Sequence, residues 1–171
     1  MELIGLANYA IFMGILIGIY ALLALGLNIQ WGLTGLFNAG IAGFFAVGAY
    51  TSAILTSPHV VGRVGGFDLP IVVGWAGAIV FAGLIAWPIG KVCLRFRSDY
   101  LAIATIGVAE IIRLVIKSED WLTGSSRGIT AIPRPFGELD YVASQLAYLG
   151  LVIAAVAVVY FLVERQLKSP W

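Results

Sequence analysis

Few residues of this chain carry groups that could act on a solute, and one pair of them lies inside an apolar stretch. Glu110 and Arg113 stand three positions apart within residues 100–116. At this spacing two residues share one face of a helix, so a carboxylate and a guanidinium can pair. Neither a histidine nor a second carboxylate lies one turn away, so acid–base catalysis has no partner. We therefore expect either a charged pair that faces a translocation path or partner subunit, or a buried ion pair between helices.

The remaining reactive side chains predict no further chemistry. Cys93 is the single cysteine and His59 the single histidine, so the sequence offers no disulfide and no metal-ligand spacing. Cys93 is expected to pack as a small apolar side chain at the end of a span. We expect His59 to be solvated in a loop, and we expect neither a metal nor a cofactor.

The composition is that of a membrane protein. The chain has 171 residues, of which 61% are hydrophobic and 11% charged, and its mean hydropathy is +1.00. A soluble domain carries about a quarter charged residues. A net charge of +1 without a basic stripe excludes nucleic acid as a partner. No Lys or Arg precedes Arg63, so the first apolar stretch is expected to be a retained span and not a cleaved signal.

The apolar stretches predict an all-α, polytopic transmembrane helix bundle of about five spans in one membrane domain. A bilayer core of ~30 Å requires about 20 apolar residues in a helix. Glu110 would then lie ~15 Å deep, where a lone charge costs about 2.5 to 3.5 kcal/mol and needs a partner. The predicted spans are residues 8–29, 33–55, 69–89, 100–116 and 142–163.

The basic residues predict an orientation for these spans. Lys91, Arg95 and Arg97 form the densest short basic cluster, between the third and fourth spans. Basic residues in short loops stay cytoplasmic. The fourth span is therefore expected to run outward, with the segment 117–141 and the N-terminus outside.

Glycines distinguish two of the stretches. Gly14 and Gly18 form a GxxxG pair, which is typical of close helix packing in membranes. The glycine-rich segment from Gly32 to Gly48, which also contains Asn38, predicts a broken or re-entrant helix. Such a break is tolerated only where the backbone faces protein or a water-filled cavity. Pore lining and tight packing both remain open for this segment.

The segment 119–136 is expected to be a structured external loop. Thr123, Gly124, Ser125 and Gly128 supply turn chemistry and exposed backbone donors. Such donors could meet the carboxylate of a passing solute or dock a partner protein, and a plain surface loop is equally compatible.

Three blocks of the sequence together resemble the permease subunits of branched-chain amino acid ABC importers, of the LivM type. They are "GLNIQWGLTGLFNAGIAGFFAVGAYTSAIL" (26–55), "FRSDYLAIATIGVAEIIRLV" (96–115) and "EDWLTGSSRGI" (119–129). The resemblance covers essentially the whole chain. Two departures stand out: Ile41 replaces a histidine that many relatives carry, and relatives are about twice as long. In relatives, the point where "VERQLKSPW" ends this sequence leads into the cytoplasmic segment that contacts the ATPase, so we expect a truncated permease.

The resemblance implies a pore subunit in the bacterial inner membrane that passes leucine, isoleucine or valine and catalyses nothing itself. It implies a second homologous permease, two cytoplasmic ATPase subunits, a periplasmic solute-binding protein and membrane lipid as partners. Carried over by position, the path or bundle-interior candidates are Asn28, Gln30, Asn38, Gly40, Glu110 and Arg113. Thr123, Gly124, Ser125 and Gly128 would face the binding protein.

Three alternatives remain beside this function. The first is an ABC permease for urea or short amides. The second is a proton- or sodium-coupled secondary transporter, in which Glu110 would titrate during the cycle. The third is a non-transporting fragment that serves in assembly.

Overall fold

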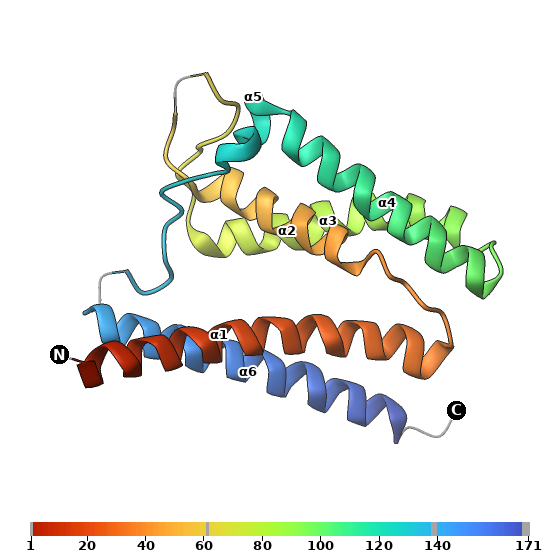
Figure 1. Ribbon diagram of the computed structural model, residues 1–171, viewed down its shortest axis with the longest axis horizontal. Helices are drawn as coiled ribbons and strands as arrows, with labels where there is room; N and C mark the ends of the chain where they lie inside the picture. Colours follow the sequence, from red (N-terminus) through yellow and green to blue (C-terminus); the bar gives the residue numbers. More distant parts are fainter. Residues whose placement is uncertain (1, 61, 138–139, 169–171) are drawn as a thin grey trace. The chain divides into compact units, whose positions relative to one another are not determined.

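The computed structural model describes residues 2–60, 62–137 and 140–168, and helices are the regular elements of this part of the chain (Figure 1). The predicted all-α class is therefore confirmed. In chain order the elements are α1 (Glu2–Asn28), the π-helix η1 (Ile29–Leu33), α2 (Ile41–Thr56), α3 (Ile71–Cys93), α4 (Ser98–Ser118), α5 (Asp120–Thr123), the 3-10 helix η2 (Ser125–Arg127) and α6 (Tyr141–Leu167).

The contacts between helices divide the described chain into two compact units. The first unit contains α1, η1 and α6, and the second contains α2, α3, α4, α5 and η2. A single membrane domain over the whole chain stays a prediction.

In the first unit, α1 and α6 run parallel and pack through small residues. Gly14 of α1 lies against Leu149 of α6, where an added Cβ would come within 3.2 Å of Leu149 Cδ1. One turn further along both helices, Gly18 lies against Val152, which is buried. The two helices begin at the same end of the unit (Figure 1). The predicted role of the GxxxG pair in helix packing is confirmed, because a larger residue at Gly14 or Gly18 would hold α6 away.

In the second unit, α2 and α3 form an antiparallel hairpin, and α4 lies parallel to α2. Gly48 of α2 faces Ala78 of α3 at 3.8 Å, measured from the Cβ that the glycine lacks. Gly43 faces the backbone of Ala109 on α4, where the same construction gives 2.8 Å to Cα. Small residues on α2 therefore bring α3 and α4 into close contact on two sides, without the bulky interdigitation of a soluble core.

Five of the helices, α1, α2, α3, α4 and α6, overlap the predicted spans and differ from them in their ends. The number of spans stays a prediction. The second predicted span, 33–55, is wrong at its start, because α2 begins only at Ile41. A hydropathy average does not show that the glycines before Ile41 interrupt the helix. Conversely, α3 continues to Cys93 and α6 to Leu167, because backbone hydrogen bonding persists beyond the first charged residue.

Among the described residues, three helical stretches are long and apolar enough to cross a membrane: Gly5–Leu33, Ile71–Cys93 and Tyr141–Leu167. Large apolar side chains along them are exposed, among them Ile17, Val72 and Ile79. A surface of this kind requires hydrocarbon around it and not water. The chain is thus a multi-pass membrane protein, and the crossing of the membrane by α2, with 16 residues, and by the charged α4 stays a prediction.

The two isolated reactive side chains lie as expected. Cys93 is the last residue of α3 and is buried. His59 is exposed in the loop after α2, with its Nδ1 atom 3.4 Å from the carbonyl oxygen of Gly65.

Candidate functional site

The helical backbone is broken between η1 and α2. Residues 35–38 lie in no helix, and Gly35 has a φ of +71°, which favours glycine. The break ends where Asn38 Oδ1 accepts the N–H of Gly40 at 2.9 Å, just before α2 starts at Ile41. The prediction of a broken helix is therefore confirmed. Because these residues lack the i to i−4 ladder, their polar backbone must face protein or water at membrane depth.

Thr105 of α4 holds the second half of this break. Its Oγ1 accepts the N–H of Ala39 at 3.1 Å and donates to the carbonyl of Ala102 at 3.0 Å. Its side chain is only 3% exposed. A Cβ on Gly40 would collide with the Thr105 carbonyl oxygen, so the backbone approaches α4 as closely as glycine permits. The structure thus brings Asn38 and Gly40 together with Thr105, a residue that the sequence analysis missed.

Replacing Thr105 with valine is expected to destabilise the second unit. Valine keeps the shape of threonine but leaves the Ala39 N–H without its acceptor, a loss worth about 1 to 3 kcal/mol when the donor is shielded from water. Thr51→Val is the matched control, because Thr51 bonds only to the Val47 carbonyl of its own helix. Thermal unfolding of the two purified variants in detergent should show the larger drop for Thr105→Val. Equal drops would mean that the bond to Ala39 contributes nothing.

Glu110 and Arg113 form the ion pair that their spacing predicts. The guanidinium donates from Nε to Glu110 Oε2 at 2.8 Å and from the other end of the fork to Oε1 at 2.5 Å. The two side chains are 50% and 55% exposed, respectively. In the described chain the pair is exposed and lies within α4, and its burial against another helix stays a prediction. A bidentate pair on an apolar surface favours a protein neighbour or a water-filled path beside α4.

The six path candidates do not form one cluster in either unit. Asn28, at the end of α1, is exposed, and Gln30 lies in η1, so both belong to the first unit. Asn38 and Gly40 meet α4 at Thr105, while Glu110 follows Ala109, the residue against which Gly43 packs. The break therefore contacts α4 at Thr105, and the ion pair begins about one turn further along the same helix, at Glu110.

The loop after α4 is built as a cap on that helix. Thr123 donates to the carbonyl of Ile116 at 2.5 Å and to that of Glu119 at 2.7 Å. Ser125 donates to the Lys117 carbonyl at 2.5 Å. The hydroxyls of Thr123 and Ser125 therefore bond to the carbonyl groups of Ile116 and Lys117 in the last turn of α4.

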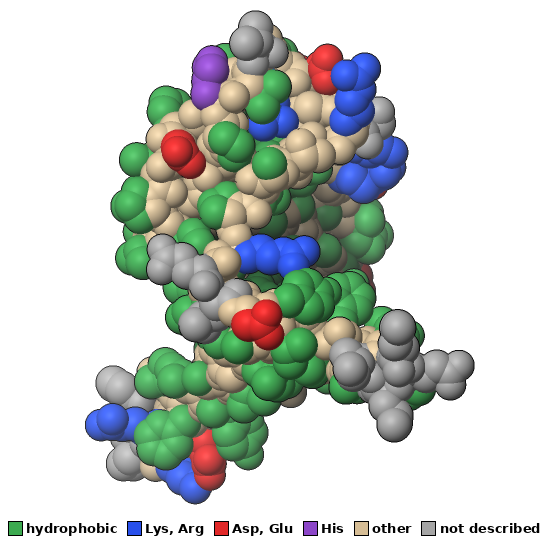
Figure 2. Space-filling model, turned by 90° about the vertical axis from the view of Figure 1, so that its left-hand side faces the viewer, with side chains coloured by type: hydrophobic (Ala, Val, Ile, Leu, Met, Phe, Trp, Pro, Cys, Tyr) green, Lys and Arg blue, Asp and Glu red, His purple; other side chains and the backbone are tan. Residues whose placement is uncertain are grey.

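The same loop joins the loop after α2 at one end of the second unit. The N–H of Val64 donates to the Trp121 carbonyl at 2.7 Å. Gly124 and Gly128 have positive φ values and donate their N–H groups to Asp120 and Ser125, so these two expected backbone donors are already used. Figure 2 shows the histidine with acidic and basic side chains on this end. The expectation of a structured loop is confirmed, and its outer face is charged.

The fold and these features define a multi-pass helical membrane protein with one interrupted helix and an exposed intrahelical ion pair. The family model described as "Branched-chain amino acid transport system / permease component" matches residues 9–171. The chain therefore belongs to this family. The expected resemblance to the branched-chain amino acid permease family is confirmed.

Curated relatives agree with this assignment. The chain is 44% identical over 117 residues to the high-affinity branched-chain amino acid transport system permease protein LivM of Escherichia coli K12, covering 68% of this chain and 26% of that protein. It is 24% identical over 162 residues to the corresponding LivH protein of Salmonella typhimurium, covering 83% of this chain and 52% of that protein. The chain thus spans about a quarter of the LivM length and about half of the LivH length. No solved structure matches the chain significantly.

Proposed function

We propose that this chain forms part of the translocation path of an ATP-driven importer for branched-chain amino acids in the bacterial inner membrane. Membership of the permease family and the names of the LivM and LivH relatives support this function. The observation that carries it within the molecule is the helical break at residues 35–40, packed against α4 through Thr105.

The break fits the chemistry of an amino acid. A zwitterion in a membrane needs donors for its carboxylate and acceptors for its ammonium group, because an unpaired charge in hydrocarbon is energetically costly. An interrupted membrane helix offers both from its backbone, without adding a fixed charge to the path. The surrounding α2 residues are apolar, such as Ile41 and Phe44, and suit an aliphatic side chain. In this proposal the amide of Asn38 and the close approach at Gly40 shape the polar part of the path.

The exposed face of α4 is the proposed contact with a second, homologous permease subunit. Ile103, Glu110 and Leu114 lie on this face and are exposed, and nothing within 4 Å would meet a Cβ on Gly107. A helix of the partner could approach closely at the glycine and cover the ion pair. Two ATPase subunits and a periplasmic binding protein complete the proposed assembly, with the charged cap around Thr123, Gly124, Ser125 and Gly128 facing the binding protein.

The energy source separates this function from a secondary transporter. Uptake of labelled leucine should be measured in cells that carry the chain within its complete transport system. Uptake is expected to continue when a protonophore collapses the ion gradient and to stop when the ATPase subunits carry an inactivating substitution. The reverse result would establish ion-coupled transport. Unlabelled isoleucine and valine should compete with leucine, whereas competition by urea alone would assign the chain to the amide permeases.

A further inference from the structure

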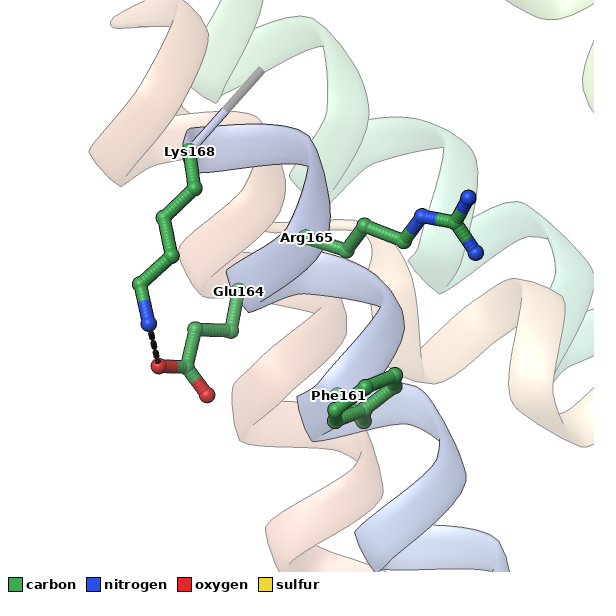
Figure 3. Close-up of a pocket in the computed structure, with 4 residues that line it drawn as sticks. All are labelled: Phe161, Glu164, Arg165 and Lys168. Carbon is green, nitrogen blue, oxygen red and sulfur yellow. Dashed lines mark hydrogen bonds and ion pairs between the residues drawn. The ribbon is translucent and has the colours of Figure 1, made fainter.

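Basic side chains collect at two helix ends, and one of these clusters has more positive charge left unpaired than the other. At the end of α6, Phe161, Glu164, Arg165 and Lys168 line a shallow hollow (Figure 3). Lys168 pairs with Glu164 at 2.5 Å, while Arg165 points away from them. In that cluster one of the two cations is therefore neutralised and Arg165 is left.

The turn between α3 and α4 differs in its charge. Lys91, Arg95 and Arg97 lie within seven residues, are all exposed, and have one acidic residue nearby, Asp99. In the described chain no ion pair joins Asp99 or another carboxylate to these three cations. Like charges this close lie within one Debye length and repel each other, so the turn favours an anion between them.

The backbone of the turn is tightly wound, and Lys91 is held beside α3. Successive backbone hydrogen bonds wind the turn: Leu94 donates to Gly90 at 2.9 Å, Arg95 to Val92 at 3.2 Å and Phe96 to Cys93 at 3.0 Å. The Lys91 ammonium lies 4.3 Å from the centre of the Trp87 ring, one turn earlier on α3. A cation–π contact of this kind keeps the lysine beside the helix.

Apolar side chains surround the charges on the same turn. Trp87 is 67% exposed, and Leu94, Phe96 and Tyr100 are exposed as well. The helix α3, which is long and apolar enough to span a membrane, ends at Cys93, so the turn lies where acyl chains give way to headgroups. Tryptophan and tyrosine prefer this depth, and lysine and arginine extend their charged ends from it toward the headgroups.

We infer that this turn is a binding site for an anionic phospholipid. Its phosphate lies between Arg95, Arg97 and Lys91, and its acyl chains run along Trp87 and the exposed apolar side chains of the turn. This site requires only that α3 crosses a membrane, and it holds whether or not the chain transports amino acids. Loss of lipid binding and loss of leucine uptake can therefore be told apart.

The test is a titration of the purified full chain in detergent with phosphatidylglycerol and, separately, with phosphatidylcholine, counting bound lipid by native mass spectrometry. Wild type is expected to prefer phosphatidylglycerol. The double variant Arg95→Gln/Arg97→Gln should weaken phosphatidylglycerol binding about 30-fold, since each basic residue near an anionic headgroup contributes about 1 kcal/mol. Trp87→Leu should weaken it about threefold by freeing Lys91.

Matched variants distinguish this site from non-specific attraction between basic side chains and anionic lipid. Arg127→Gln/Arg134→Gln removes the same charge from exposed loop positions and should leave lipid binding unchanged, and Arg95→Lys/Arg97→Lys should retain most of it. Equal affinity for the two lipids, or an equal loss in the Arg127/Arg134 variant, would overturn the inference. Displacement of the lipid by excess inorganic phosphate would also overturn it, because the turn would then be a simple anion site.

Discussion

Glu110→Gln is expected to abolish most leucine uptake by the complete transport system and to reduce the amount of chain inserted in the membrane. The substitution removes the counter-charge of the Arg113 guanidinium and at least one of its two hydrogen bonds to residue 110, because the amide NH2 group donates and cannot accept. An unpaired charge at the centre of a membrane helix costs about 2.5 to 3.5 kcal/mol, which corresponds to roughly 100-fold in an equilibrium. Uptake of labelled leucine and the fraction of chain resistant to carbonate extraction are the two measurements.

Two double variants distinguish a structural pair from a functional one. Glu110→Gln/Arg113→Gln removes both charges and should restore insertion, because no unpaired charge remains. Glu110→Arg/Arg113→Glu keeps a pair at the same spacing in reversed order. If Glu110 faces the path or a partner subunit, both double variants stay defective in uptake despite normal insertion. Wild-type uptake by the single variant Glu110→Gln would eliminate a path-lining role for this carboxylate.

Gly43→Ala is expected to push α2 and α4 apart and to destabilise the second unit. The new Cβ would lie 2.8 Å from Ala109 Cα and 3.1 Å from its Cβ, so the backbones themselves must separate. Overpacking of this kind costs about 1 to 3 kcal/mol, which exceeds the gain of about 1 kcal/mol from replacing glycine within a helix. Gly83→Ala on α3 is the control, since nothing lies within 4 Å of its Cβ position, and it should be stabilising.

The unfolding temperature in detergent checks this prediction. Gly43→Ala should lower it and Gly83→Ala should leave it unchanged or raise it. Equal shifts would show that α2 and α4 are not held together at this glycine. The difference between the two alanine variants removes the effect of helix propensity, which both share.

Sequence reasoning predicted what depends on local composition. Apolar runs located the helices, and the i, i+3 spacing predicted the ion pair of Glu110 and Arg113, because both are properties of a single helix. Hydropathy misplaced the start of α2 because glycine and alanine count as apolar whether or not they are helical. The concentration of glycines with Asn38 was the better indicator of the break at residues 35–40.

Thr105 was missed for a different reason. A hydroxyl in a membrane helix ordinarily bonds a carbonyl one turn back, and Thr105 does so with Ala102. Its second bond, to the N–H of Ala39, joins residues 66 positions apart, and no local pattern encodes that pairing. Likewise, the glycines predicted close packing but not its partners, so the pairing of α1 with α6 and of α2 with α3 came only from the structure.

Because α1 and α6 run parallel, the number of membrane crossings between them must be odd. It follows that α3 crosses either alone or together with both α2 and α4. We therefore expect the described helices to cross the bilayer three or five times. In both cases residues near Glu2 and residues near Lys168 emerge into different compartments, and a reporter fused at one position would be shielded from a probe that reaches the other.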